Sequence, residues 1–363
     1  MRKLAQILYS GLGGHGSVVF SLITAGRESW THALGFLGVE PLLEEYRQRC
    51  TEGGMAFRYF PAFAGRPWTQ WRAVQQWLTQ QQPDAILCHS GSALLPSAAY
   101  ARLRGIPLVF VEHTPLATKP AGEWAASRLA MLLADRIVML TPAYAKAVHR
   151  RLGRFYRPGK VVVIPNGIDT DQFHPGRSRP LGGTVRLGMA ARFSTAKRQD
   201  LLVELVAWLN EHAANVQWEL SLPGIGEERL RIEELAECRA PGRVHFPGLL
   251  SQPELACWLR SLDIYLHASD GETLSTSMLQ AMATGLPLVA SNVPGIDDLL
   301  TPGTGLRVGN GDLDAWGNAV VDLCADPRKR ADLAHNARAT AEADYSMQAM
   351  RLRYEAVLER AVQ

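Results

Sequence analysis

Cysteine is scarce in this chain of 363 residues, and its spacing argues against two kinds of scaffold. The five cysteines are odd in number, widely separated and never in a CxxC pair: Cys50, Cys88, Cys238, Cys257 and Cys324. A disulfide framework needs paired cysteines, and a structural zinc site needs closely spaced ligands. We therefore expect reduced, buried thiols in a cytosolic compartment.

Long apolar runs and low-complexity segments are also missing. The start, MRKLAQILYSGLGGHG, breaks its apolar run at glycines, so it does not predict a signal peptide. The longest apolar candidate, LAMLLADRIVML, is interrupted by Asp135 and Arg136 and falls short of the roughly 20 residues of a spanning helix. With 47% hydrophobic and 20% charged residues, the composition is that of a globular α/β protein, which we expect in the cytoplasm.

The two halves of the chain differ in charge. Residues 1–175 hold 19 Lys and Arg against 11 Asp and Glu, a net charge of +8, whereas the remainder holds 19 against 24, a net charge of −5. This asymmetry indicates that the first half faces something anionic, such as a membrane surface or a phosphorylated acceptor.

Short apolar runs alternate with amphipathic stretches throughout. In the first half the runs are KLAQILYS, THALGFLGV, DAILCHS, PLVFVEH, DRIVMLT and KVVVIPN; in the second they are VRLGMAA, QWELSLPG, RVHFPG, DIYLHAS and PLVASNV. The spacing leaves room for crossover helices, which is typical of a parallel sheet covered on both faces. Because the chain is also longer than one core supports, we predict two doubly wound α/β domains.

Turn residues place the domain boundary. The connector IPNGIDTDQFHPGRSRPLGG has little periodicity, and we predict domains at 1–176 and 177–345. Residues 346–363 form a last helix that Ser346 can cap, and we expect its apolar stripe to pack back across the hinge. The stripe consists of Met350, Tyr354, Val357 and Leu358.

A glycine-rich turn follows the first predicted strand. In GLGGHG, the glycines Gly11, Gly13 and Gly16 satisfy the GxGxxG spacing, and Glu40 closes the next strand where a ribose-binding acid would lie. This pattern favours an NAD-type oxidoreductase. The same glycines also suit a tight turn in which backbone approaches backbone.

The stretch MAARFSTAKRQDLL places Arg192 and Lys197 on one loop at the opening of a helix. Two cations beside helix N–H groups suit a diphosphate. The alternative is a solvated basic loop.

The stretch ETLSTSMLQAMATG follows the strand DIYLHAS. Ser275, Thr276 or Ser277 can cap a helix that ends near Gly285, so that Glu272 lies in the preceding loop and Gln280 about one turn inside the helix. Both side chains would then face the space above the strand ends, where open parallel sheets bind ligands. The alternative is an exposed glutamate and a glutamine on the flank of a helix.

These stretches resemble a known family. The run from Asp263 to Gly295 resembles the E-x7-E region of retaining GT-B glycosyltransferases of family 4, and Arg192 with Lys197 resembles the family's R-x4-K pair. The resemblance continues through GIGEERLRIEELA, VHFPGLLSQPELACWLRSLD, VIPNGIDTDQFHP and the glycine-rich turn. It implies two Rossmann-like domains facing a cleft, with the nucleotide-sugar donor bound mainly by the second and the acceptor by the first.

The resemblance also implies residue roles on the donor side. Glu272 would bind donor-sugar hydroxyls, Arg192 and Lys197 would hold the diphosphate, and Gln280 would hold the ribose. Backbone N–H groups near Leu274 and Ser275, and those of Gly13 and Gly14 in the glycine-rich turn, would also contact the donor. The chain departs from the family pattern at Gln280, where a second glutamate is usual, and at Thr273 and Leu274, where glycines are usual.

Three histidines of the first half are candidates for a role. His113, the last residue of PLVFVEH, stands where the family commonly has a histidine facing the reacting sugar. His15 on the glycine-rich loop could meet the acceptor or a phosphate. His89 is more consistent with strand packing.

The function implied is transfer of a hexose or N-acetylhexosamine from a UDP- or GDP-sugar to a glycan or lipid-linked acceptor, in bacterial surface polysaccharide or lipopolysaccharide synthesis. The family model implies retention of configuration without a metal, and with no cofactor besides the nucleotide-sugar co-substrate. Two alternatives stay open: the NAD-type oxidoreductase, and a catalytically silent sugar-nucleotide-binding protein, for which Gln280 is the reason.

Two segments suggest contact with the inner face of the cytoplasmic membrane, and none suggests nucleic acid. HRRLGRFYRPGK mixes five basic residues with Phe155 and Tyr156, which suits an anionic bilayer. In RPWTQWRAVQQWL three tryptophans could lie at an interface, although Trp71, Val74 and Leu78 also describe a stripe that packs on the sheet.

Overall fold

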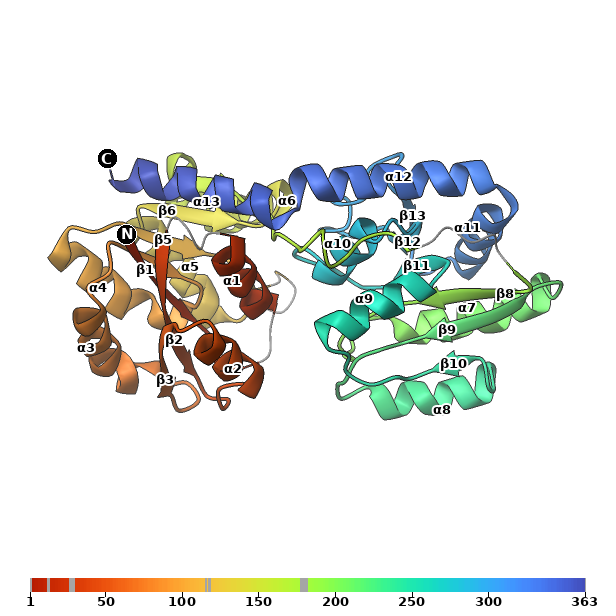
Figure 1. Ribbon diagram of the computed structural model, residues 1–363, viewed down its shortest axis with the longest axis horizontal. Coiled ribbons are helices and arrows are strands. Elements are labelled where there is room, and N and C mark those ends of the chain that lie inside the picture. Colours follow the sequence, from red (N-terminus) through yellow and green to blue (C-terminus); the bar gives the residue numbers. More distant parts are fainter. Residues whose placement is uncertain are drawn as a thin grey trace. The chain divides into compact units, whose positions relative to one another are not determined.

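The computed structural model describes residues 2–11, 14–25, 30–114, 116, 119–176 and 182–362 (Figure 1). The chain divides into two compact units, Met1–Gly167 with Met347–Gln363, and Ile168–Ser346. The division after Gly167 precedes the boundary predicted at residue 176, and it assigns the last helix to the first unit. Each of the two sheets lies within one unit.

The first unit is built on a parallel sheet of seven strands in the order β3-β2-β1-β4-β5-β6-β7. Its strands are β1 (Arg2–Leu8), β2 (Trp30–Gly38), β3 (Ala56–Pro61), β4 (Ala85–Cys88), β5 (Leu108–Val111), β6 (Arg136–Met139) and β7 (Val161–Val163). The strands β4 and β5 are buried along their whole length, as expected of central parallel strands covered on both faces.

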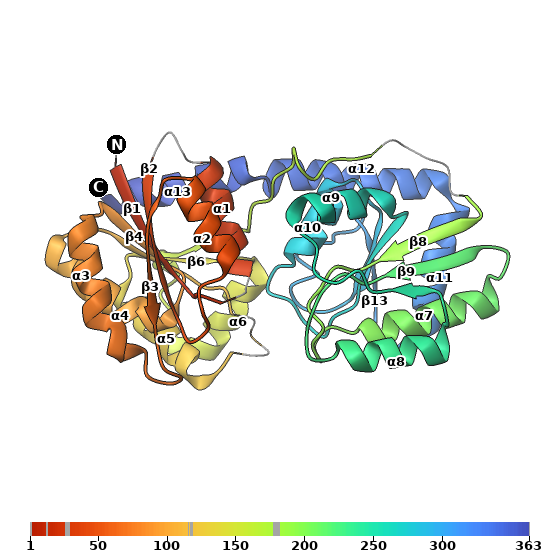
Figure 2. The same cartoon turned by 60° about the horizontal axis from the view of Figure 1, so that its bottom comes forward.

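Helices cover the two faces of this sheet (Figures 1 and 2). They are α1 (Gly14–Ala25), α2 (Glu44–Glu52), α3 (Trp71–Gln81), α4 (Leu94–Arg104), α5 (Ala121–Leu133) and α6 (Pro142–Leu152). Short 3-10 turns lie at Pro67–Gln70, Gly91–Ala93, Gly153–Phe155 and Pro158–Lys160. Apolar residues are buried on both faces of the sheet, α3 and α4 packing in one cluster and α1 in another.

The second unit repeats the plan with six parallel strands in the order β10-β9-β8-β11-β12-β13. They are β8 (Thr184–Gly188), β9 (Gln217–Ser221), β10 (Val244–His245), β11 (Ile264–His267), β12 (Leu288–Ser291) and β13 (Leu306–Val308). The helices are α7 (Gln199–His212), α8 (Arg229–Arg239), α9 (Gln252–Ser261), α10 (Thr276–Ala283), α11 (Leu313–Ala325) and α12 (Pro327–Asp344).

The predicted fold class, two parallel-sheet α/β domains, is confirmed. All eleven apolar runs form strands, whereas β3 and β13 were not predicted. Both additional strands lie at sheet edges. The strand β3 has largely exposed side chains and β13 has three residues, so neither forms the buried apolar run that marks a central strand.

The last helix, α13 (Met347–Val362), packs on the first unit. Its predicted stripe is buried against residues of β1, α1 and neighbouring strands: Met350, Tyr354, Val357 and Leu358. The sulfur of Met350 also accepts a hydrogen bond of 3.1 Å from the backbone N–H of Gly167. The chain therefore completes the core of its first unit with its final residues.

Candidate functional site

In each sheet the strand order reverses between two central strands, at β1/β4 in the first unit and at β8/β11 in the second. Ligands bind beyond the carboxyl ends of the strands at such a switch point. The second unit places the loop 189–198 after β8 and the loop 268–275 after β11 at this position. A bridge between Lys197 and Ser269 joins the two loops.

Glu272 lies at the centre of this region. Its carboxylate is largely buried and forms an ion pair with Lys197. The same oxygen, Oε1, lies 2.7 Å from Nε2 of His267, the last residue of β11. Because a carboxylate only accepts hydrogen bonds, the Nε2–H of His267 donates, and its Nδ1 is buried with no partner among the described residues.

The charges of this cluster explain its protonation states. Burial alone would raise the pKa of Glu272, but the ammonium of Lys197 and the hydrogen bond from His267 lower that pKa to about 2. Burial lowers the pKa of His267 against the opposing effect of Glu272. At neutral pH the cluster therefore holds an ionised carboxylate between an ammonium and a neutral imidazole.

Backbone packing holds Glu272 in place. The backbone N–H of Glu272 donates to the carbonyl of Pro294 at 3.2 Å. The next residue, Gly295, has a φ of +88°, and a Cβ there would collide with the carbonyl oxygen of Glu272. Only glycine meets both conditions without strain, so the loop after β12 positions the carboxylate.

A polar network fastens the loop that carries Glu272. The hydroxyl of Ser291, at the end of β12, accepts a hydrogen bond of 2.9 Å from the backbone N–H of Ser269. It donates a hydrogen bond to Oδ1 of Asn310. The amide of Asn310 donates to the carbonyl of Ser269 at 2.9 Å and to Asp270 at 3.0 Å. Sequence reasoning missed Asn310 and His267, because their roles depend on segments that meet only after folding.

The two predicted cations differ in their surroundings. Lys197 is partly buried and forms its ion pair with Glu272. Arg192 is exposed and lies 3.5 Å from the carboxylate of Glu227. A third cation, Arg198, pairs with Asp200 at 3.0 Å and lies 3.6 Å from Asp270. The structure therefore brings Lys197 together with Glu272 but leaves Arg192 in a separate pair.

The helix α10 begins as predicted. Ser275 is its N-cap, and its hydroxyl accepts from the backbone N–H of Met278 at 3.4 Å. Leu274 and Thr273 are buried, and the Thr273 hydroxyl has no partner in the described part of the chain. Gln280 is also buried, and its Nε2 donates to Oε1 of Gln252 at 3.0 Å, so it is not an exposed residue on a helix flank.

The first unit gathers histidines at its own switch point. The Nε2 of His113 lies 2.9 Å from Nδ1 of His89, and the ring of His15 lies 6.2 Å from that of His113. Burial holds the pKa of His113 well below its ordinary value, and the neighbouring His89 and His15 lower it further. His89 makes specific polar contacts and does more than pack between strands.

The loop after His113 is held by a buried ion pair that the sequence did not indicate. Glu112 and Lys119 lie 2.5 Å apart and are almost fully buried. Glu112 also accepts from Ser127 at 2.5 Å, and Tyr144 donates to the carbonyl of Thr114 at 2.8 Å. This network holds Glu112, Thr114 and Lys119 in place.

The glycine-rich turn has a packing role where it is described. A Cβ on Gly11 would collide with the carboxylate of Glu40, and a Cβ on Gly16 would collide with the hydroxyl of Tyr46. Gly14 is the first residue of α1, and Gly13 lies outside the described residues. The carboxylate of Glu40 therefore fills the space beside Gly11.

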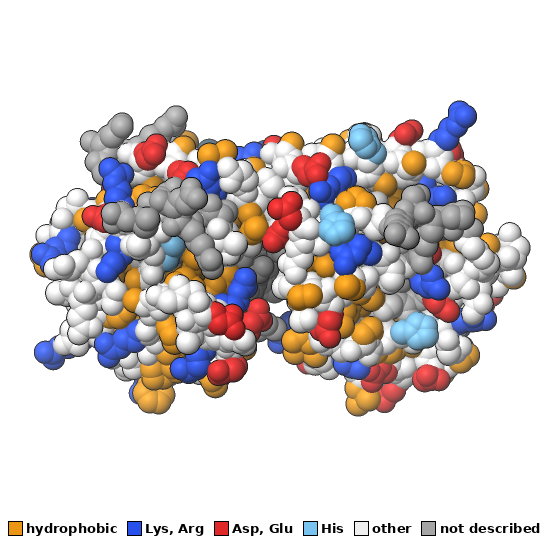
Figure 3. Space-filling view, viewed as in Figure 1, with side chains coloured by type: hydrophobic (Ala, Val, Ile, Leu, Met, Phe, Trp, Pro, Cys, Tyr) orange, Lys and Arg blue, Asp and Glu red, His pale blue; other side chains and the backbone are white. Residues whose placement is uncertain are grey.

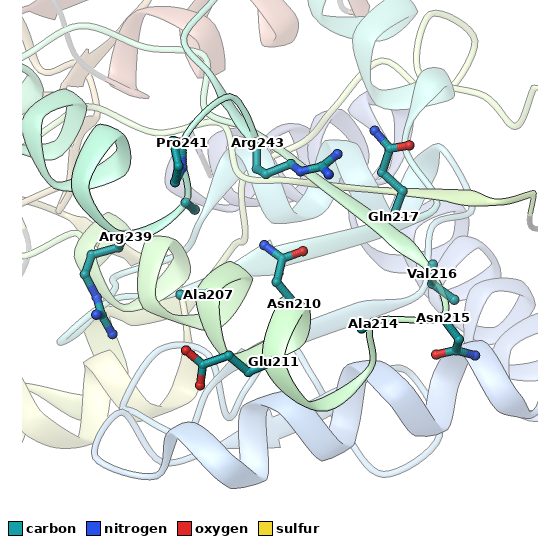
Figure 4. Close-up of a pocket in the computed structure, with 11 residues that line it drawn as sticks. Ala207, Asn210, Glu211, Ala214, Asn215, Val216, Gln217, Arg239, Pro241 and Arg243 are labelled. Atoms are coloured by element: carbon teal, nitrogen blue, oxygen red, sulfur yellow. The ribbon is translucent and has the colours of Figure 1, made fainter.

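A cavity of about 560 Å³ lies away from these residues (Figure 4). It is lined by the end of α7, the start of β9 and the segment before β10, including Asn210, Glu211, Gln217, Arg239 and Arg243. These segments lie at the edge where the strands begin, opposite the edge that carries Glu272. We assign no chemistry to it.

The two parallel-sheet α/β units have the GT-B fold. Residues 12–172 match the family described as Glycosyltransferase Family 4, and residues 184–326 match the family described as Glycosyl transferases group 1. The chain therefore contains these two glycosyltransferase domains, one after the other. The family matches give no support to the oxidoreductase alternative.

Curated relatives include a D-inositol 3-phosphate glycosyltransferase of Paenarthrobacter aurescens, which is 27% identical over 71% of this chain and 68% of the relative. Another D-inositol 3-phosphate glycosyltransferase, from Stackebrandtia nassauensis, is 29% identical over 77% of this chain and 63% of the relative. A GDP-mannose-dependent mannosyltransferase of Corynebacterium glutamicum is 27% identical over 54% of this chain and 55% of the relative. The chain therefore spans roughly half to two thirds of the length of the curated relatives it matches.

Solved structures with the same fold include Anabaena Alr3699/HepE in complex with UDP and glucose, with a TM-score of 0.81 and 20% identity over 99% of both chains. The sucrose-phosphate synthase of Thermosynechococcus elongatus has a TM-score of 0.80 and 20% identity over 99% of both chains. Across the described residues, no helix is both long and apolar enough to cross a bilayer.

Proposed function

We propose that this protein is a retaining glycosyltransferase that transfers a hexose or N-acetylhexosamine from a UDP- or GDP-sugar. The observation that carries the proposal is the cluster of Glu272, Lys197 and His267 beyond β8 and β11. An ionised, oriented carboxylate suits recognition of sugar hydroxyls, and the adjacent ammonium suits a diphosphate. The solved structure of HepE with UDP-glucose supports a donor of this class.

The donor proposal assigns a role to each neighbouring group. The ammonium of Lys197 has three N–H donors, so it can hold Glu272 and a phosphate oxygen together. The N-terminus of α10 offers backbone N–H groups near Leu274 and Ser275. Arg192 is exposed, and we propose that it exchanges Glu227 for the diphosphate. Gln280 binds the ribose, and Gly13 and Gly14 contact the donor.

The proposed mechanism uses no protein nucleophile. Positive charge from Lys197 and Arg192, together with the N–H groups of α10, stabilises the leaving diphosphate without a divalent metal. The departing phosphate takes the proton of the acceptor hydroxyl. The carboxylate of Glu272 is committed to Lys197 and His267, which supports a binding role for it. His113 of the first unit faces the reacting sugar.

We further propose a glycan or lipid-linked acceptor at the inner face of a bacterial membrane, in surface polysaccharide or lipopolysaccharide synthesis. Residues 120–163 hold eight Lys and Arg against two Asp and Glu. In Figure 3 basic and acidic side chains are interspersed over the visible face of the first unit, so the positive charge is not concentrated there.

The basic surface proposed for the membrane contact combines the end of α6 with α5. Arg150 and Arg154 are exposed, as are Leu129 and Leu132 of α5. The two segments meet at Phe155, whose ring is approached by Arg128 of α5 and by Arg154. Phe155 is partly buried against the core, and the guanidinium groups of Arg128 and Arg154 lie 5.3 and 5.2 Å from the centroid of its ring. The apolar component is therefore leucine rather than Phe155.

The second predicted interface, RPWTQWRAVQQWL, is mostly part of the core. Trp77 is buried, and the indole N–H of Trp71 donates to the carbonyl of Ser92 at 2.9 Å. Trp68 alone among the three tryptophans is exposed, at 55%. We therefore propose the α5–α6 surface for membrane contact.

Thermal stabilisation by UDP, GDP, CMP and NAD tests the donor proposal. A ligand at 100 times its dissociation constant adds about 2.7 kcal/mol to the free energy of unfolding. We expect a shift with UDP or GDP only, followed by release of that nucleotide from the matching sugar donor when an acceptor is present. Binding without release would support a catalytically silent sugar-nucleotide-binding protein, and a shift with NAD alone would overturn the proposal.

A further inference from the structure

A continuous chain of polar side chains crosses the sheet of the first unit. It links residues on or directly after four adjacent strands, β2, β1, β4 and β5, which are neighbours in the sheet order. The side chains are His32, Gln6, His89 and His113 in that order. Polar side chains are rare inside such a sheet, because burial without hydrogen bonds costs free energy.

Gln6 is the central member of this chain. It lies in β1 with 0% exposure, between Leu34 of β2 and Leu87 of β4 in the sheet register. Its Nε2 lies 3.1 Å from Nδ1 of His32, and its Oε1 lies 3.1 Å from Nε2 of His89. The chain ends at His32, whose Nε2 is buried and makes no hydrogen bond within the described residues.

The rings in this chain are neutral at physiological pH. Burial, with a contribution from His15, lowers the pKa of His89 to about 3, and burial lowers the pKa of His32 to about 4. A neutral imidazole has one N–H and one lone pair, so each ring that donates from one nitrogen accepts at the other. The direction of one hydrogen bond therefore determines the direction of the next.

The amide of Gln6 sets this direction. Its oxygen faces His89, so the Nε2–H of His89 donates to it and the Nδ1 of His89 carries the lone pair. That lone pair accepts from His113, whose Nε2 then carries the proton. Rotation of the amide by 180° would reverse every bond and place the proton of His113 on Nδ1.

We propose that Gln6, acting through His89, is a positioning residue that fixes His113 in the Nε2–H tautomer. The half-buried ring of His113 then presents its Nδ1 lone pair as an acceptor for a hydroxyl donor. Recognition of a sugar hydroxyl by this lone pair rests on the proposed function, whereas the tautomer itself does not. The ring orientation is determined by the same contact, since Nε2 is held 2.9 Å from His89.

Nitrogen NMR of histidine-labelled protein tests the tautomer directly. In the wild type at pH 7.5, long-range proton–nitrogen spectra should show His113 and His89 each as a single Nε2–H tautomer, with His113→Asn assigning the signal. Gln6→Met removes the acceptor of His89, so the His113 signal should move toward a mixture of both tautomers. His89→Phe should do the same if Gln6→Met fails to fold.

The control is Ser97→Ala, which removes another buried polar side chain of the first unit that lies outside this chain. It should leave the His113 signal unchanged. A wild-type His113 protonated at Nδ1, or an unchanged signal in Gln6→Met or His89→Phe, would overturn the proposal. These spectra need no substrate, so they remain decisive even if the protein proves not to transfer sugar.

Transfer kinetics test the consequence for the reaction. Gln6→Met should lower kcat/KM about fivefold, the usual effect of losing one neutral hydrogen bond. The loss should disappear in a His113→Ala background, because both substitutions then act through the same ring. Equal losses in both backgrounds would show that Gln6 does not act through His113.

Discussion

At the scale of single residues, the donor proposal depends most on Lys197. Its ammonium is paired with Glu272, and the family-like spacing places Arg192 on the same loop. Lys197→Met keeps the length of the side chain and removes the charge. We expect sugar transfer to fall by about 100-fold or more, the effect of losing a donor that stabilises the transition state.

The matched control is Arg186→Met in the middle of β8, which removes an exposed cation that contacts Glu219 of the neighbouring strand β9. Its transfer rate should equal that of the wild type. Arg192→Ala should lower the transfer rate as Lys197→Met does, because we propose that both side chains contact the diphosphate. Near-normal turnover in either variant would contradict the diphosphate assignment for that residue.

Gln280 raises a separate question, since a neutral amide stands where relatives of this type usually have glutamate. Gln280→Glu should retain transfer and bind the nucleotide about fivefold more tightly, because a carboxylate makes charge-assisted bonds to a ribose diol. Gln252 can rotate its amide to donate to the new carboxylate. Calorimetric titration with the nucleotide measures the affinity, and complete loss of transfer would show that the amide is required.

At the scale of elements, the loop after β12 determines where the carboxylate of Glu272 lies. Gly295→Ala forces a side chain into a positive-φ conformation and against the carbonyl of Glu272. We expect a loss of about 1–3 kcal/mol in the free energy of unfolding of the second unit, with weaker nucleotide binding. Urea unfolding and titration measure the two effects.

The neighbouring Gly271 supplies the control for this substitution. A Cβ on Gly271 meets no atom within 4 Å, and its φ lies outside the positive range. Gly271→Ala should therefore change the free energy of unfolding by less than about 0.5 kcal/mol. Equal destabilisation by both substitutions would mean that contact with Glu272 is not the cause.

At the scale of the whole molecule, buried neutral histidines make stability depend on pH. The pKa of His89 is lowered to about 3 in the folded state, against 6.5 when exposed. Below pH 6.5 the unfolded chain binds a proton that the folded chain does not, so stability falls as pH falls through this range. His89 alone should lower the free energy of unfolding by about 2 kcal/mol as the pH falls from 7.5 to 5.

Hydrogen exchange of the β1 and β4 amides at the two pH values measures this loss in the first unit. His89→Gln removes the titrating ring and should reduce the dependence on pH. Glu272 affects stability at lower pH, because its pKa is lowered to about 2 in the folded state. Its stabilisation is lost only as pH falls from about 4.5 toward 2. A flat profile between pH 7.5 and pH 5 would contradict a neutral buried His89.

The proposed membrane contact uses the α5–α6 surface of the first unit. The double variant Arg150→Glu with Arg154→Glu should weaken binding to anionic phospholipid vesicles by at least about tenfold, since each basic residue near such a surface contributes about 1 kcal/mol. Arg102→Glu with Arg104→Glu changes the net charge equally on α4 and should have a smaller effect. Equal losses would implicate net charge rather than the α5–α6 surface.

Much of the candidate site was predictable because family 4-like motifs are local. Ser275 as the cap of α10, and Arg192 with Lys197 before α7, follow from residues close together in the chain. His267, Asn310 and Gly295 were not predicted as partners of the Glu272 loop, because each lies on a different strand end or loop. Gln6 gave no signal either, since one polar residue in an apolar strand has no distinctive spacing.

The sequence by itself determined the two-domain α/β plan, because alternating apolar runs and turn residues act over short distances. It also determined the family, through the spacing of charged and capping residues around single turns. Only the tertiary structure decided that Glu272 is ionised between Lys197 and His267, and that four polar residues form one chain across four strands: His32, Gln6, His89 and His113. Such contacts join residues up to 83 positions apart, as Gln6 and His89 are, and only the packing of parallel strands side by side brings them together.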